Sequence, residues 1–150
     1  MTRRPYIVGN WKMHGTRAML SEARAIDRAA QRHMKVEVAL APPYTLIHPI
    51  HREAEQIGVG AQDCHHMDGG AHTGDISAAM IADAGAKFVI LGHSERRTEH
   101  SESDARVRAK AEAALAAGLR IIMCCGESAE TRESGTAVAF VKKQLKASLP

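Results

Sequence analysis

The stretch FVILGHSERR, residues 88–97, decides the fold. An apolar run ends in a glycine, and His93, Ser94 and Glu95 follow directly after it. This order is typical of a buried strand that carries polar side chains at its carboxyl end. Open and closed α/β folds both place their chemistry at that end of the sheet. The stretch therefore predicts an α/β protein with a functional site beside His93.

A second predicted strand ends in the same way. In YIVGNWKMHG, residues 6–15, an apolar run leads to Asn10 and Lys12. A lysine in this position can hold a phosphate or stabilise an enediolate by its charge. Asn10 can bond a substrate hydroxyl or orient Lys12, although asparagine is also a common turn residue. Together the two strand ends indicate a site for a polar or anionic small molecule.

Short apolar runs alternate with helical patterns along the chain. The runs are apolar throughout, as expected of parallel strands buried on both faces. Five β-α units of this total length suit an open doubly wound sheet of the flavodoxin type, judged from the pattern alone. The predicted strands are residues 6–9, 36–40, 58–61, 88–91 and 119–124.

Amphipathic stripes predict helices within residues 20–30, 107–115 and 138–149. Gly85 and Gly118 stand where helices should stop. The connection after the second strand contains three prolines, which argue against a long helix there. A helix that begins at Pro49 and runs to residue 56 is the alternative.

Composition limits the classes of function. The chain has 150 residues, a formal charge of +3 and only 3% aromatic residues. Dispersed basic residues without stacking aromatics argue against a nucleic-acid partner, and no apolar run is long enough to cross a membrane. An odd number of cysteines, three, argues against a disulfide framework and favours a reducing, cytoplasmic location. Neither a GxGxxG turn nor a Walker loop supports a nucleotide site.

Four blocks in order, GNWKMHGT, GAQDCH, GAHTGDISAAMIADAGAKFVILGHSERR and MCCGES, resemble the triosephosphate isomerase family. The resemblance runs from about Arg4 to the last residue. It implies a partial (β/α)8 barrel made of the first five β-α units, so residues 1–150 would form a single domain that is an incomplete barrel. It also implies that the family's catalytic glutamate and lid loop lie beyond Pro150, and that this chain is inactive alone.

The same resemblance implies the activity and the site. The family interconverts glyceraldehyde 3-phosphate and dihydroxyacetone phosphate in glycolysis and gluconeogenesis, without cofactor or metal. His93 matches the family's neutral electrophilic histidine, a role known for triosephosphate isomerase itself. Asn10 and Lys12 match substrate-binding residues, and Lys12 is also catalytic. Glu95 matches a buried catalytic glutamate, with Ser94 and Cys124 in supporting positions.

The long stretch 62–77, QDCHHMDGGAHTGDIS, is either a functional loop or a mobile surface loop. In the family the corresponding loop enters a neighbouring subunit of a homodimer, and Thr73 and Gly74 match its tip. Asp63, Cys64, His65 and His66 suggest a metal site, but adjacent residues rarely point at one ion. We therefore expect no metal.

Two departures from the family pattern concern packing. Cys125 stands where an aliphatic residue is common, and His100 where an aromatic is common. The main alternative to an isomerase is a non-catalytic module for phosphate-ligand binding or assembly. A further alternative is the open sheet with an unrelated phosphoryl site, which strand order distinguishes from a barrel.

Overall fold

The computed structural model describes residues 3–150. Its sheet has five parallel strands in the order β1-β2-β3-β4-β5. A flavodoxin-type sheet would place the first strand inside the sheet, between the second and the third. Here β1 lies at an edge, so that alternative is wrong. The strands confirm the predicted runs to within one residue at either end: β1 Tyr6–Asn10, β2 Glu37–Ala41, β3 Gly58–Ala61, β4 Phe88–Leu91 and β5 Arg120–Met123.

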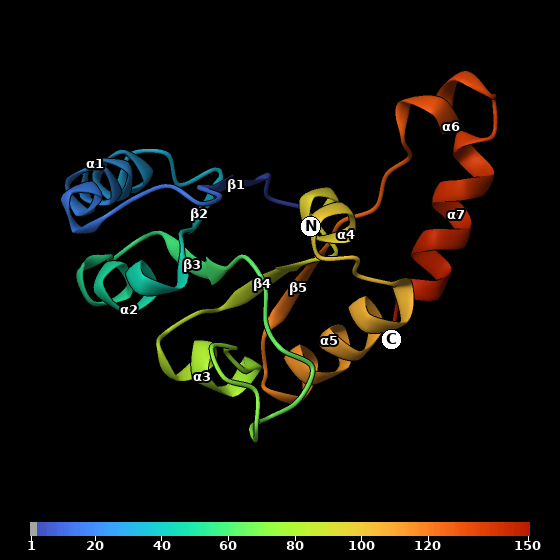
Figure 1. The fold of residues 1–150 in the computed structure, drawn as a ribbon. Coiled ribbons are helices and arrows are strands. Elements are labelled where there is room, and N and C mark those ends of the chain that lie inside the picture. The colour runs from blue at the N-terminus through green and yellow to red at the C-terminus, as the bar shows by residue number, and fades with distance from the viewer. Residues whose placement is uncertain (1–2) are drawn as a thin grey trace.

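The sheet is curled into an open part of a barrel (Figure 1). The Arg120 Nη2 atom on β5 lies 3.0 Å from the Glu37 Oε1 atom on β2. These strands are three positions apart in the sheet, which would separate them by about 14 Å if it were flat. The helices on the convex side are α1 Leu20–Gln31, α2 Tyr44–Glu53, α3 Ala78–Asp83 and α5 Asp104–Ala116.

Helix α2 corrects the expectation for the proline-rich connection. It begins at Tyr44, five residues before the predicted start at Pro49, and Pro49 lies inside it. Pro49 lacks the N–H that would continue the helical ladder. Burial compensates for this loss, because Leu46, Ile47 and Ile50 are each only 1% exposed against the sheet. Tertiary packing has overridden the local signal of the proline.

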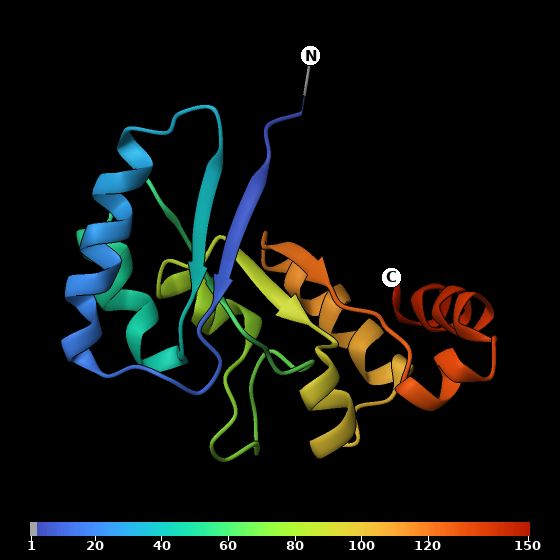
Figure 2. The same ribbon diagram turned by 90° about the horizontal axis from the view of Figure 1, so that it is seen from above.

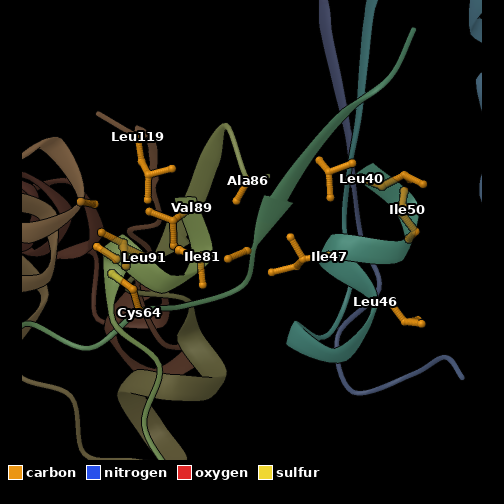
Figure 3. Close-up of a cluster of buried hydrophobic side chains, with 14 of the residues drawn as sticks. Leu40, Leu46, Ile47, Ile50, Cys64, Ile81, Ala86, Val89, Leu91 and Leu119 are labelled. Atoms are coloured by element: carbon orange, nitrogen blue, oxygen red, sulfur yellow. The ribbon is translucent and has the colours of Figure 1, made fainter. Parts of the chain in front are cut away.

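Two apolar layers lie on the two faces of the sheet. The convex face and its helices share a continuous core that includes Leu40, Val89 and Leu91 (Figure 3). The concave face carries a smaller cluster around Phe88. Gly60 makes this inner packing possible, since a Cβ atom there would lie 2.4 Å from the Phe88 ring. Side chains thus alternate between the layers along β2, β4 and β5, as the pleat of a strand requires.

The remaining helices are η1 Arg17–Met19, α4 Ser94–Glu99, α6 Ala129–Glu133 and α7 Ala137–Ser148. Helix α7 packs on α5 and lies away from the sheet (Figure 2). Its predicted apolar stripe is only partly buried, because Val138 is 69% exposed and Leu149 lies beyond the helix end. Among residues 3–150, no helix is both long and apolar enough to cross a membrane.

Candidate active site

The carboxyl ends of the strands all point to one side of the sheet, where α4 and the loop after β3 project (Figure 2). An open cavity of about 440 Å³ lies there. It is lined by residues from the end of β1, from the loops after β1, β2 and β3, from the start of α2, and from α4 and its two flanking residues. The polar side chains in this lining include Asn10, Lys12, Gln62, His93 and Glu95. The structure thus brings together the residues that were predicted from two separate strand ends.

Lys12 has an unusual backbone conformation, with φ of 53°. A non-glycine residue in the left-handed region is uncommon and needs support from its surroundings. Asn10 supplies part of that support, because its Oδ1 atom accepts a hydrogen bond from the Lys12 N–H at 2.9 Å. Gln62 supplies the rest by donating to the carbonyl oxygens of Lys12 and Ala41, each at 2.8 Å. Asn10 is therefore both a turn residue and a group that orients Lys12.

The Lys12 ammonium group is aimed at α4. Its Nζ atom lies 2.7 Å from the Glu95 Oε1 atom. The two side chains are 52% and 46% exposed, so Glu95 is not the buried glutamate that the resemblance implied. Its place in the first turn of α4, at the mouth of an open cavity, explains this exposure. The hydrogen bond from Lys12 holds the pKa of Glu95 below its ordinary value, which keeps the carboxylate ionised.

His93 is the residue that caps α4. Its Nδ1 atom accepts a hydrogen bond from the Glu95 backbone N–H at 3.2 Å. The Glu95 carboxylate is more distant from the same nitrogen, at 3.5 Å. An Nδ1 atom that accepts a backbone N–H carries no proton, so the proton of the neutral ring lies on Nε2. His93 can therefore donate an Nε2–H group to a ligand in the cavity.

Arg97 holds the strand ends together, a role that the sequence did not reveal. Its Nε atom donates to the Gly92 carbonyl at 2.7 Å, and its Nη2 atom donates to the Cys124 carbonyl at 3.2 Å. It also bonds Asp104 at the start of α5 and Ser148 at the end of α7. Gly92 leaves room for this guanidinium, because a Cβ atom there would lie 2.7 Å from Nη2. Arg97 is a positioning residue for the backbone that carries His93.

A largely buried ion cluster borders the cavity and was also missed. Lys110 on α5 is bonded to Asp63 at 2.9 Å and to Glu102, and its side chain is only 6% exposed. Arg96 approaches Asp63 and Glu102 at 3.1 Å each. Burial raises the pKa of Glu102, but Lys110 and Arg96 outweigh it and leave the pKa below its ordinary value. Two acids and two bases make the cluster neutral, which is how a protein tolerates buried charge.

The other predicted residues lie around the site rather than in it. Ser94 is exposed in the first turn of α4. Cys124 packs with the concave face, and burial raises the pKa of its thiol, which disfavours the reactive thiolate. Thr73 and Gly74 are exposed in the loop between β3 and α3, away from Lys12 and His93.

Parallel strands in sequential order, curled and covered outside by helices, place the chain in the class of (β/α)8-barrel proteins, of which it has five units. The chain belongs to the triosephosphate isomerase family, whose model matches residues 5–150. It is 53% identical to the triosephosphate isomerase of Caulobacter vibrioides, over 99% of this chain and 60% of that protein.

Other relatives agree with this assignment. The chain is 50% identical to the triosephosphate isomerase of Rhizobium etli, over 98% of this chain and 59% of the relative. The crystal structure of triosephosphate isomerase from Bartonella henselae matches with a TM-score of 0.95 and 47% identity, over 99% of this chain and 62% of the solved one. The chain thus spans about 60% of the length of the relatives that it matches.

Proposed function

We propose that this chain supplies the electrophilic part of a triosephosphate isomerase site, which interconverts glyceraldehyde 3-phosphate and dihydroxyacetone phosphate through an enediolate. The observation that carries the proposal is the His93 ring, whose Nδ1 accepts the Glu95 N–H beside the Lys12–Glu95 ion pair in one cavity. Related proteins that are named triosephosphate isomerase support the same reaction.

In the proposed mechanism, His93 and Lys12 act on the oxygens of the substrate. The His93 Nε2–H group donates to an oxygen that gains negative charge as the enediolate forms. The Lys12 ammonium stabilises that charge and attracts the phosphorylated substrate, and Asn10 fixes the backbone from which Lys12 extends. Preorganised donors of this kind are typically the largest contribution to catalysis, because they need no rearrangement during the reaction.

Glu95 has a catalytic role in this proposal, but not as the proton-transfer base. A base needs an available carboxylate with a pKa near the working pH. Glu95 is engaged by Lys12 at 2.7 Å, and that bond lowers its pKa. Its proposed role is to hold the Lys12 ammonium in the cavity until substrate binds. We assign no proton-transfer base among the residues that the structure describes.

The proposal also covers assembly and location. We infer a homodimer in which Thr73 and Gly74 enter the partner subunit, and their exposure in the loop between β3 and α3 supports this. We place the enzyme in the cytoplasm, in glycolysis and gluconeogenesis, and expect it to need no cofactor. We further propose that residues 1–150 form one domain, an incomplete barrel.

An isomerase assay on two proteins tests the function. The first is the 150-residue chain, and the second is this chain joined to the remaining part of the Caulobacter vibrioides relative. We expect turnover in the joined protein and at least about a hundredfold less in the chain alone, because a missing general base typically costs 10²- to 10⁴-fold. Robust turnover by the chain alone that His93→Asn abolishes would contradict our account of the base.

The alternative is a non-catalytic module for phosphate-ligand binding or assembly. The open cavity with Lys12 at its mouth is the observation that favours it. An inactive joined protein that still binds dihydroxyacetone phosphate in calorimetry would support this alternative over the isomerase.

A further inference from the structure

We propose that Ser148, at the end of α7, is a positioning residue for His93 and acts through Arg97. Ser148 is 0% exposed, and among the residues of α7, all of which the structure describes, it is the only buried one. A buried hydroxyl needs hydrogen-bond partners, and the partners of Ser148 lead toward the cavity. The inference deepens the proposed function, because it rests on His93 as the group that donates to the substrate.

The hydroxyl of Ser148 completes a small closed network. Its Oγ atom accepts a hydrogen bond from the Arg97 Nη2 atom at 3.0 Å and donates to the Asp104 Oδ1 atom at 3.3 Å. The Arg97 Nη1 atom donates to the same carboxylate oxygen at 2.7 Å. A hydroxyl has one donor and two acceptor positions, so Ser148 can serve both neighbours at once. The end of α7, which packs on α5, thereby fixes one side of the Arg97 guanidinium (Figure 1).

The other side of the guanidinium faces the strand ends. Its Nε atom donates to the Gly92 carbonyl at 2.7 Å, and its Nη2 atom donates to the Cys124 carbonyl at 3.2 Å. A guanidinium is planar, and its N–H groups keep fixed directions relative to one another. A rotation that follows the loss of the Ser148 hydroxyl would therefore also move the N–H group that holds Gly92.

Gly92 transmits this constraint to His93. Its carbonyl belongs to the peptide group that carries the His93 N–H, and a peptide group moves as a rigid plane. Gly92 has φ of 69°, and a glycine leaves the orientation of that plane more freedom than any other residue would. The bond from the Glu95 N–H to the His93 Nδ1 atom is 3.2 Å long, so a small tilt of the ring would break it. The contact of Arg97 with Gly92 therefore helps to decide whether His93 presents its Nε2–H group to the cavity.

Asp104 does not hold the guanidinium equally well without Ser148. The Asp104 side chain is 37% exposed, so water competes for its oxygens. The buried Ser148 hydroxyl donates to the oxygen that Arg97 uses, which restricts the rotation of the carboxylate. Hydrogen bonds in such a chain also strengthen one another. Loss of the hydroxyl should therefore loosen both contacts of Arg97 at this side.

Nitrogen NMR of the 150-residue chain tests the positioning without depending on activity, with folding checked by circular dichroism. In the parent chain we expect the neutral His93 ring to carry its proton on Nε2 alone. In Ser148→Ala we expect a mixture of the two tautomers and a shift of the Glu95 amide resonance, because Nδ1 loses its partner. Ser148→Thr keeps the hydroxyl and should restore the signals of the parent chain.

A control separates positioning from stability. Asp27 on α1 bonds backbone N–H groups just before β3, at the opposite end of the sheet. Asp27→Ala should destabilise the chain and leave the signals of His93 and Glu95 unchanged.

Kinetics of the chain joined to the remaining part of the Caulobacter vibrioides relative measures the consequence for catalysis. Ser148→Ala should lower kcat at least about tenfold and leave KM within about twofold, because a misplaced catalytic group loses rate more than binding. In an Arg97→Lys background, Ser148→Ala should change kcat by no more than about twofold, since lysine lacks the planar fork that Ser148 holds.

Three results would overturn the inference. The first is a Ser148→Ala chain whose His93 tautomer and Glu95 amide match those of the parent. The second is an Asp27→Ala control that shifts these signals equally. The third is a kcat effect of Ser148→Ala that persists in the Arg97→Lys background, because Ser148 would then act by another route. A joined parent without turnover would contradict the proposed function instead, and the His93 signals would still decide the role of Ser148.

Discussion

The two ends of the curled sheet carry ion pairs that look alike and sit in different surroundings. At the carboxyl end, Lys12 and Glu95 are 2.7 Å apart, with side chains 52% and 46% exposed. At the amino end, Arg120 and Glu37 are 3.0 Å apart, with side chains 59% and 42% exposed. The first pair borders an open cavity with His93, whereas Arg120 of the second lies over the Tyr6 ring. The surroundings of an ion pair, rather than its N–O distance or its exposure, therefore distinguish a candidate functional pair from a structural one.

The two ends of the sheet also differ in how side chains hold the backbone. At the carboxyl end, Lys12 is held in a left-handed conformation by side chains, which is a cost to stability. At the amino end, a side chain instead stabilises an ordinary backbone. The Asp27 carboxylate accepts hydrogen bonds from the N–H groups of Glu55, Gln56 and Ile57, just before β3. Barrel folds commonly divide their ends in this way, with function at the carboxyl face and stability at the other.

Replacing Lys12 by methionine is expected to have the largest effect. In the protein joined to the remaining part of a relative, Lys12→Met should lower turnover by about 10²- to 10³-fold and weaken substrate binding, because a preorganised charge is lost. Arg120→Met is the control from the other end and should leave turnover within about twofold. Steady-state kinetics measures both, and near-normal values for Lys12→Met would remove this residue from the site.

Removing the Asp27 carboxylate should have the next largest effect, on stability alone. Asp27→Ala leaves three N–H groups unpaired near a residue that is 5% exposed, and we expect a loss of about 3 kcal/mol in the free energy of unfolding. Denaturant unfolding at neutral pH measures this loss. An unchanged midpoint would mean that solvent replaces the carboxylate without cost.

The stabilisation that Asp27 contributes should depend on pH. Burial raises the pKa of Asp27, but the hydrogen bonds from three backbone N–H groups and Gln31 outweigh it, so the pKa lies below its ordinary value. A pKa that is lower in the folded chain gives a contribution that is complete above about pH 4 and is lost as the pH falls through the folded value. The difference between Asp27→Ala and the parent chain should therefore shrink in acid.

The sequence predicted the local features of the two ends, but not the contacts across the sheet. Local patterns were sufficient for the strands and for the placement of His93, Lys12 and Asn10 at one edge of the sheet, because these residues follow apolar runs closely. Pairings across long separations were not predictable in this way. The Lys12–Glu95 and Arg120–Glu37 contacts each join residues 83 positions apart. They exist only because the sheet curls, whereas the pattern of apolar runs alone favoured an open doubly wound sheet.

Helix α2 and the loop after β3 show two further limits of prediction from the sequence. Pro49 argued locally for a helix boundary, and only the burial of the neighbouring side chains explains why the helix continues. The side chains of His65, His72 and Asp75 come together because the loop is closed by backbone hydrogen bonds that no spacing rule describes. In both places the tertiary structure decides what the local sequence leaves open.

A smaller effect is expected at the tip of the loop that projects from the carboxyl end. In the joined protein, Thr73→Glu should weaken dimerisation by at least about tenfold, because the new charge would be buried at the interface without a partner. Thr136→Glu is a matched control, since Thr136 is exposed at the start of α7. Sedimentation velocity at several concentrations measures both variants. A dimer that Thr73→Glu leaves intact would make this loop an ordinary surface.

The smallest effect is expected from the Arg120–Glu37 pair, and it tests the comparison most directly. Exposed ion pairs typically contribute about 0–1 kcal/mol, so Arg120→Met should lower the free energy of unfolding by no more than about 1 kcal/mol. A double-mutant cycle with Glu37→Gln isolates the pair from the contact between Arg120 and Tyr6.

The pair also joins β2 and β5, two strands that share no backbone hydrogen bonds. A structural role in holding the curl of the sheet would therefore add to the attraction between the two charges. A coupling energy well above 1 kcal/mol that persists in high salt would reveal that second role, since screening removes a simple surface attraction. A small coupling that salt abolishes would leave the curl to the apolar layers.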